Sequence, residues 1–508
     1  MTATTEAQPT APTTFKHPVL APPRHYPMLA ADWAIFGLFG FLALLTRFMY
    51  LNRLSDAGTP IFDEKHYVPQ AWQILRSTDN ALVGGIEDNP GFGLVVHPPL
   101  SKQIMAVGEF FFGYTPLGWR FMAALAGIAV VLLVMAIVRR LTHDRWATFA
   151  AGVLAIGEGV LLTSSRVGML DIFLTAFVVL AAYFLIVDRD DVHRRMHSAY
   201  LAGRVSVSSL GPRFGVRWWR FGAGIALGLA LGVKWSGLYF IAAFGLLTFG
   251  FDWALRNRYG VKRPLVGTLL RDVPAAVASI VLVPAAVHLW LWRAWFASET
   301  SVYRHVAGTD TAPREGRSGL LPETLQSWVY YQNSVLGFHG SLTTSSGHKH
   351  PWESKPWQWL WSGRPMLYYN KETDGCGGKC HEALMLFGNP AVWWLLVPVM
   401  LLATWLWLVR LSRRWALPVV GFIASWAPWV VTYDRQMYFF YATAMIPFVI
   451  IALAMLLGKL RRAPSGALLY SIYLGAVTAL FLFFLPLMVG LEVSQLGWEL
   501  RMWLPSWQ

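Results

Sequence analysis

The sequence Ile-Phe-Asp-Glu-Lys-His-Tyr occupies residues 61–67, directly after the first long apolar segment of the chain. It places two adjacent carboxylates, Asp63 and Glu64, beside a lysine, a histidine and a tyrosine, although only 14% of all residues are charged. Acidic residues inside or beside a membrane are rare and usually have a function. We therefore expect residues 61–67 to form a functional loop at a membrane surface, which the rest of the chain positions.

The composition is that of a membrane protein. Hydrophobic residues make up 55% of the 508 residues, and the mean hydropathy is +0.44. Apolar runs of about 20 residues, enough to cross a bilayer core, recur along the whole length. The net charge of +14 does not indicate a nucleic-acid partner, because Lys and Arg gather in short loops between the apolar runs.

The apolar runs predict an all-α polytopic membrane protein with about eleven transmembrane helices. Their approximate bounds are 33–51, 116–138, 147–163, 171–187, 221–233, 238–255, 273–292, 390–409, 416–431, 437–457 and 466–489. Basic residues gather in every second connection, which the positive-inside rule assigns to the cytoplasm. The sequence therefore predicts a multi-pass protein of the plasma membrane with a cytoplasmic N-terminus.

This pattern divides the chain into four regions. Residues 1–28, rich in Thr, Pro and Ala, are expected to be a disordered cytoplasmic tail. Residues 29–295 form an N-terminal transmembrane module with a first extracytoplasmic loop at 52–115. Residues 296–389 form a large extracytoplasmic loop, and residues 390–508 hold the C-terminal transmembrane helices. No internal repeat is visible, and the unusual charges gather on one membrane face, so an ion-conducting transporter is disfavoured.

Asp63 and Glu64 are neighbours, so on a regular element their side chains cannot point the same way. Two different roles are therefore expected for them. A partly desolvated carboxylate near the interface has a raised pKa and can take a proton from a hydroxyl group. The alternative is a solvated loop with a salt bridge to Lys65, and the pair alone favours neither.

His97 and Lys102 follow in the same loop, on either side of Pro98-Pro99. The two prolines fix the backbone and can present both side chains rigidly to a substrate. A stiff loop that enters an interfacial helix at 101–112 explains the same pattern. Further interfacial helices are expected elsewhere in the extracytoplasmic loops.

Arg120, Arg166 and Asp171 lie at or just inside the ends of predicted spans. A charge within a membrane helix costs on the order of 2.5–3.5 kcal/mol, so each must pair with another residue or bind a ligand. Arg166 and Asp171 are close enough in sequence to form a structural pair. Arg120 has no local partner, which favours a ligand, Asp63 or Glu64.

Lys234 and Arg435 lie in turns on the predicted outer side. Two cations at the depth of lipid phosphates suit a phosphate-bearing ligand. Long basic side chains also reach for lipid headgroups without any further function. Both interpretations stay open for each residue.

The large loop contains His348, Lys355 and Trp357 within a segment rich in aromatic residues. Aromatic rings beside polar groups suit sugar or peptide recognition, and equally an interfacial helix. His348 and His350 could bind a metal, but the segment lacks a clear carboxylate pattern, so no metal site is predicted. Cys376 and Cys380 are the two cysteines of the chain, and their place on the oxidising side favours a disulfide.

Several segments, taken in chain order, resemble motifs of the protein O-mannosyltransferases. They are Thr46-Arg47-Phe48 with residues 61–67, His97-Pro98-Pro99-Leu100, Gly118-Trp119-Arg120-Phe121, Ser165-Arg166 with Leu170-Asp171, Val233-Lys234-Trp235-Ser236-Gly237-Leu238, residues 354–359 with Arg364-Pro365, Gly388-Asn389-Pro390, and Arg435 with Pro447-Phe448. The resemblance covers nearly the whole chain. Its most specific parts are the Asp-Glu pair and the Lys-Pro-Trp-Gln-Trp segment at 355–359.

The resemblance implies a GT-C glycosyltransferase fold with its active site in the N-terminal module, at the outer membrane face. It also implies inverting transfer of mannose from a polyprenyl-phosphate carrier to Ser or Thr hydroxyls of secreted proteins. Asp63 is then the general base, and Glu64 positions acceptor or sugar. Arg120, Lys234 and Arg435 face phosphate or the carboxylates. No cofactor is implied with certainty, and dependence on a divalent cation stays open.

Eukaryotic members of this family carry an additional β-trefoil domain in the large loop. A loop of roughly ninety residues cannot hold one, so the chain resembles the bacterial, actinobacterial-type form. The expected partners are the lipid-linked mannose donor, secreted protein acceptors, membrane lipids and the secretion translocon. The alternative is a GT-C enzyme that modifies a glycolipid or a cell-wall glycan.

Overall fold

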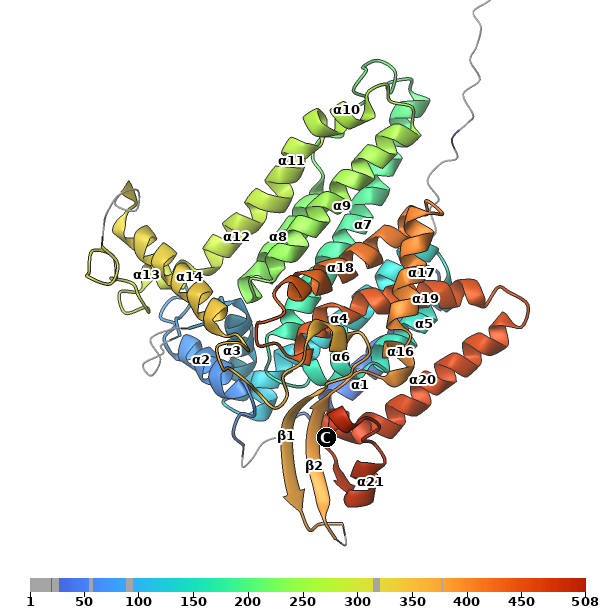
Figure 1. Ribbon diagram of the computed structural model, residues 1–508. Coiled ribbons are helices and arrows are strands. Elements are labelled where there is room, and N and C mark those ends of the chain that lie inside the picture. The colour runs from blue at the N-terminus through green and yellow to red at the C-terminus, as the bar shows by residue number, and fades with distance from the viewer. Residues whose placement is uncertain (1–19, 21–26, 54–57, 88–94, 314–319, 377) are drawn as a thin grey trace, which may run out of the picture.

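The computed structural model describes residue 20 and residues 27–53, 58–87, 95–313, 320–376 and 378–508 (Figure 1). The predicted disordered tail at 1–28 lies outside these residues, apart from residues 20, 27 and 28. Most of the described chain is helical, as the apolar runs predict.

The helices in and around the apolar region follow the predicted spans. They are α1 (Ala30–Phe48), α4 (Pro116–Thr142), α5 (Arg145–Ile156), α6 (Gly159–Ser164), α7 (Asp171–Leu201), α8 (Trp218–Val233), α9 (Gly237–Arg258), α11 (Val273–Val277), the π-helical turn Ala278–Leu282, α12 (Val283–Leu291), α16 (Pro390–Trp393), α17 (Leu396–Leu408), α18 (Ala416–Val431), α19 (Ile446–Leu460) and α20 (Gly466–Val489).

Shorter helices connect these elements. They are α2 (Glu64–Arg76), α3 (Leu100–Phe112), α10 (Pro264–Arg271), α13 (Arg293–Ala297), α14 (Glu323–Ser341), α15 (Pro356–Trp359), α21 (Gln495–Glu499), and the 3₁₀ turns Arg413–Trp415, Phe439–Ala444 and Pro505–Trp507. Figure 1 shows α10 at one end of α7–α9, and α2, α3 and α14 towards the other. The basic connection at α10 and the acidic motif at α2 therefore lie at opposite ends.

Eight stretches of the described chain are helical, long and apolar enough to cross a membrane, and three shorter apolar helices accompany them. The shorter ones are α5, α8 and α19. Together they correspond to the predicted spans, with local differences. The predicted span 147–163 is divided between α5 and α6, because the Glu158 carboxylate caps the first backbone N–H groups of α6.

Two other span boundaries differ from the prediction. α7 continues to Leu201, well past the predicted end at residue 187. Ion pairs of Asp191 with Arg194 and Arg195 support its polar last turns. The predicted span 437–457 starts with a 3₁₀ turn, and α19 begins beside Pro447, whose fixed φ suits the first turn of a helix.

α4 is the central helix of the N-terminal module. It packs against α1, α3, α5, α7 and α19. The approach of α3 to α4 is close because both contact surfaces carry glycine. A Cβ on Gly108 would lie 2.3 Å from the carbonyl oxygen of Gly118, so α3 can lie against α4 only with glycine there. This packing holds the last turns of α3 against the start of α4.

The all-α prediction missed a small antiparallel sheet of order β1-β2-β3. Its strands are β1 (Met366–Thr373), β2 (Cys380–Leu386) and β3 (Glu492–Ser494). The hairpin turn contains Asp374-Gly375, a dipeptide that favours tight hairpin turns. Residues 383–386 of β2 and the start of β1 at Met366 belong to the hydrophobic core, so the sheet extends the bundle instead of forming a separate domain.

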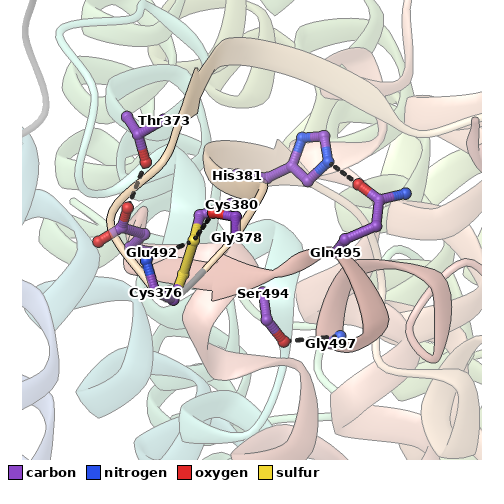
Figure 2. The surroundings of a disulfide bond; sticks show 9 residues. All are labelled: Thr373, Cys376, Gly378, Cys380, His381, Glu492, Ser494, Gln495 and Gly497. Carbon is purple, nitrogen blue, oxygen red and sulfur yellow. Dashed lines mark hydrogen bonds between the residues drawn. A yellow bond between two sulfur atoms is a disulfide. The ribbon is translucent and has the colours of Figure 1, made fainter.

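A disulfide between Cys376 and Cys380 closes the hairpin turn, as the sequence predicts. Figure 2 shows it beside the hydrogen bond from Thr373 to Glu492, which ties β1 to β3. The next residue of β2, His381, bonds Gln495, which directly follows β3, at 2.7 Å. The cross-link therefore sits where the three strands meet.

We expect the double variant Cys376→Ser/Cys380→Ser to weaken this hairpin. Closing a loop this short restricts the unfolded chain by about 2 kcal/mol in the chain-entropy account. The variant should be cut by protease in the segment 374–379 faster than the native protein. Treatment of the native protein with a reductant should give the same cleavage. Equal cleavage rates in all three samples would contradict a stabilising cross-link.

Candidate active site

The acidic motif starts with an unusual backbone conformation. Phe62 has a φ of 47°, a left-handed value that is rare for an aromatic residue. Asp63 then occupies the N-cap position of α2, and Glu64 is the first helical residue. Strained residues of this kind concentrate at functional sites. The turn sends the two neighbouring carboxylates into different surroundings.

Glu64 is fully buried and receives four hydrogen bonds. Arg120 on α4 donates to both carboxylate oxygens at 2.7 and 2.8 Å. The backbone N–H groups of Gly168 and Ile61 donate at 2.7 and 3.0 Å. Arg120 also bonds the carbonyl oxygen of Leu51 at 3.2 Å. Of the two alternatives for Arg120, ligand or carboxylate, the structure therefore shows the carboxylate.

Asp63 is only half-buried, and no hydrogen bond reaches its carboxylate from any described residue. Burial raises the pKa of the Asp63 carboxyl above its ordinary value. Lys234 and His66 oppose this shift, while Asp171 adds to it. A carboxylate with a raised pKa and no hydrogen-bond partner among the described residues is chemically able to accept a proton.

Lys234, which directly follows α8, binds Asp171 at the start of α7. Its Nζ lies 2.8 and 2.9 Å from the two carboxylate oxygens. It also lies 5.4 Å from the ring centres of both Phe440 and Tyr441. The pairing of Arg166 with Asp171, considered from the sequence, is wrong. Arg166 instead donates to the backbone carbonyls of Thr46 and Arg47 near the end of α1.

A cavity of about 250 Å³ lies beside this ion pair. Its polar lining residues are His97, Asp171, Lys234, Ser236, His339, Ser425 and Arg435. Its apolar and aromatic lining comes mainly from α7, α9 and α18 and includes Leu174, Leu238, Phe240, Ala424, Trp429 and Tyr441. The cavity therefore offers cations and histidines in one part and a hydrocarbon-like wall in another.

Arg435 is held beside two histidines. Its Nη2 lies 2.9 Å from Nδ1 of His339, and the rings of His339 and His97 are 5.4 Å apart. Burial and nearby cations lower the pKa of His339 to about 4 and that of His97 well below its usual value. Both histidines are therefore neutral at neutral pH, and Lys234 and Arg435 carry the positive charge.

Lys355 contacts the backbone of the turn that carries Arg435. Its Nζ donates to the carbonyl oxygen of Arg435 at 3.2 Å and pairs with Glu353 at 2.5 Å. The loop segment at Thr343 and Thr344 also pairs with the backbone at Asp434 and Arg435. In this arrangement Lys355 supports the turn that carries Arg435 and does not line the cavity.

Three other predicted substrate-binding residues lie away from the cavity. Lys102 is buried in an ion pair with Glu87 and bonds the carbonyl oxygen of His97 at 3.1 Å. His348 is exposed on the large loop, and Trp357 is 51% exposed. Lys102 therefore shapes the backbone at His97, whereas His348 and Trp357 lie on the surface.

The predicted residues that do come together are Asp63, His97, Asp171, Lys234 and Arg435. The structure adds His339 and Tyr441, which the sequence analysis did not select. His339 lies between Phe338 and Gly340 in the predicted large loop. The aromatic and polar composition of that loop is the only feature of the sequence that could have pointed to it. Tyr441 lies in an aromatic run that looks like any other part of a membrane span.

Family models match two long parts of the chain. Residues 98–298 match the family described as dolichyl-phosphate-mannose-protein mannosyltransferase. Residues 324–507 match the C-terminal four-transmembrane region of protein O-mannosyltransferase.

Curated relatives match almost the full length. A polyprenol-phosphate-mannose–protein mannosyltransferase of Corynebacterium glutamicum is 52% identical over 486 residues, covering 94% of this chain and 93% of the relative. One from Mycobacterium tuberculosis is 48% identical over 489 residues, covering 94% and 92%.

Solved structures resemble the chain at lower identity. The Saccharomyces cerevisiae protein O-mannosyltransferase Pmt1-Pmt2 complex bound to the sugar donor has a TM-score of 0.71 at 14% identity, covering 95% of this chain and 93% of that one. ArnT from Cupriavidus metallidurans in the apo state has a TM-score of 0.50 at 16% identity, covering 91% and 77%.

The helical bundle has the GT-C fold, and the family matches define a membrane glycosyltransferase. Within that class, the chain belongs to the protein O-mannosyltransferase family, in its bacterial polyprenol-phosphate-mannose form.

Proposed function

We propose that the chain transfers mannose from polyprenyl-phosphate-mannose to Ser or Thr hydroxyls of secreted proteins at the extracytoplasmic face of the plasma membrane, with Asp63 as general base. One observation carries the assignment of the base. Asp63 is a carboxylate without a hydrogen-bond partner among the described residues, and it lies within electrostatic reach of Lys234. The names of the curated relatives support the donor and the protein acceptor.

The reaction is a single displacement. The acceptor oxygen attacks the anomeric carbon, the bond from that carbon to the phosphate oxygen breaks, and the phosphate leaves with the bonding electrons. Asp63 receives the proton of the acceptor hydroxyl, and one direct attack inverts the anomeric centre. Lipid phosphate is a good leaving group, so cations that stabilise its charge are sufficient and a strong general acid is not required.

Lys234 and Arg435 are the cations placed for this task. Both line the cavity, and Arg435 Nε is buried without a hydrogen-bond partner among the described residues. The apolar walls from α7, α9 and α18 suit the polyprenyl chain of the donor. His97 and His339, both neutral, can share hydrogen bonds with the phosphate or the sugar.

The proposed topology rests on charge placement. The basic connections around α10 and at Arg413 and Arg414 lie on the cytoplasmic side by the positive-inside rule. The acidic motif then lies on the outer side, where secreted acceptors pass. Delivery of unfolded acceptors by the secretion translocon fits this placement. In this proposal Glu64 has a structural role, because Arg120 and two backbone groups use all of its hydrogen-bonding oxygens.

Substitution of Arg435 by alanine should raise the KM for the mannosyl donor. Loss of a hydrogen bond to a charged group costs about 1.5–3 kcal/mol, which corresponds to roughly 10–150-fold. The assay measures initial rates against donor concentration. Lys349→Gln removes a positive charge from the exposed outer loop and should leave the KM for the donor unchanged. An unchanged KM in the Arg435 variant would remove this residue from phosphate binding.

The transfer rate should fall as the pH is lowered. Asp63 must be deprotonated to act as a base, and burial raises its pKa. The acidic limb of the profile should therefore have its midpoint above 3.8, the ordinary pKa of an aspartate. The measurement is kcat/KM for an acceptor peptide against pH. A rate that increases towards acid pH would show that the essential group acts in its protonated form.

The acceptor class is tested with membranes that contain the protein, radiolabelled polyprenyl-phosphate-mannose and a Ser/Thr-rich secreted peptide. Label on the peptide that β-elimination releases supports the proposal. Label in lipid or cell-wall glycan instead would assign the enzyme to the alternative acceptor class.

A further inference from the structure

Tyr368 interrupts the regular pairing of β1 with β2. Leu367 pairs with Met385 and Tyr369 pairs with Leu384, so Tyr368 is the additional residue of a bulge. Bulges turn a side chain out of its regular alternation and are frequent beside active sites. Tyr368 is thus a strand residue whose direction the bulge determines.

The ring of Tyr368 lies against the residues that carry the proposed site. Its centre is 5.1 Å from the ring of Phe62, which precedes Asp63. It is 6.5 Å from the ring of Phe440, which in turn lies 5.4 Å from Nζ of Lys234. Tyr368 therefore lies close to the residues that carry the proposed base and to those that surround the Lys234–Asp171 pair.

The phenol of Tyr368 is buried and has no hydrogen-bond partner among the residues that the structure describes. The residue is 5% exposed, and its oxygen makes no hydrogen bond within the described part of the chain. Buried polar groups are nearly always paired, so an unpaired one calls for an explanation. Burial, with the nearby carboxylates Asp171, Asp63 and Glu64, raises the pKa of Tyr368 well above its usual value. The phenol thus keeps its proton and is available as a donor.

We propose that Tyr368 is a sugar-binding residue, whose O–H donates to a hydroxyl of the mannosyl group that lies beside Asp171, while Asp63 stays free for the acceptor hydroxyl. A hydroxyl can donate to a carboxylate and accept from a phenol at the same time, as this position requires. Three carboxylates lie near the phenol, and this favours a neutral sugar hydroxyl over a phosphate at that position. The assignment rests on the proposed function.

The test compares two ligands of the purified full-length protein, polyprenyl-phosphate-mannose and sugar-free polyprenyl phosphate. Tyr368→Phe removes only the phenolic oxygen. It should weaken binding of the mannosyl lipid by about 2–12-fold, the range for one neutral hydrogen bond. Binding of the sugar-free lipid should not change, which also shows that the variant is folded. Tyr473→Phe, which removes a phenol that donates to the carbonyl oxygen of Ala391, is the matched control.

A series of monodeoxy-mannosyl lipids identifies the hydroxyl. One deoxy lipid should bind the native protein more weakly than the parent, yet bind Tyr368→Phe as well as the parent does. Equal losses for both lipids in Tyr368→Phe, or no loss, would overturn the assignment. Binding is measured without an acceptor, so the outcome is separate from the acceptor assay: absence of peptide transfer in the native protein would refute the proposed function alone.

Discussion

Asp63→Asn should reduce mannosyl transfer by about 10²–10⁴-fold, the usual contribution of a positioned general base. The amide keeps the shape of the side chain but cannot take the proton of the acceptor hydroxyl. Donor binding should be preserved, because Lys234 and Arg435 hold the phosphate in this account. The measurement is a single-turnover transfer rate, with the donor Kd determined in parallel.

The matched control is Asp374→Asn, the same change at an exposed carboxylate in the hairpin turn. It should transfer mannose at the native rate. A native rate in Asp63→Asn would remove Asp63 from the chemistry. Loss of donor binding in Asp63→Asn would instead make this residue part of donor recognition.

Glu64→Gln should destabilise the fold. The substitution leaves the charge of Arg120 buried, since both side chains are fully inaccessible to solvent. Removing one partner of a buried pair costs about 3–5 kcal/mol. Glu64 also joins α2 to α4 and to the turn before α7, so the loss affects several elements at once. Thermal unfolding in detergent measures the effect.

The double variant Glu64→Leu/Arg120→Met tests whether the buried ion pair contributes to stability or to substrate binding. It removes both charges, so it should be more stable than the sum of the single changes Glu64→Leu and Arg120→Met predicts. If Glu64→Gln were fully stable yet inactive, Glu64 would contact substrate, as the family resemblance implies. Full stability and full activity together would contradict the structural role given to the pair.

The sequence predicts the membrane helices well, because their signal is local. An apolar run long enough to cross a bilayer has few alternatives to a helix. The common location of Asp63, His97, Lys234 and Arg435 also follows from the order of spans, since their loops lie on one face. The order of spans does not show which side chains contact one another.

The ion pairs show this limit most clearly. Arg120 and Glu64 are 56 residues apart in the chain, and Lys234 and Asp171 are 63 apart. Proximity in sequence favoured Arg166 for Asp171, but helix packing brings Lys234 there. Lys102 was considered a ligand because of the adjacent Pro-Pro pair, yet it is bound to Glu87. Partners of this kind depend on tertiary packing.

Tyr368 shows a second limit. Nothing in its sequence neighbourhood distinguishes it from Tyr369, and the hairpin itself was not predicted. Its direction results from a bulge whose register is set by β2. A one-residue change of register would turn the other tyrosine inwards.

The configuration of the product tests the account most directly. Purified protein in liposomes is given a polyprenyl-phosphate-mannose donor of known anomeric configuration and a Ser/Thr peptide, and NMR determines the linkage of the mannosyl peptide. The account predicts a mannose on a Ser or Thr oxygen with inverted configuration, formed by one attack with Asp63 as base. Retained configuration would require a covalent intermediate on the enzyme and would contradict the single displacement.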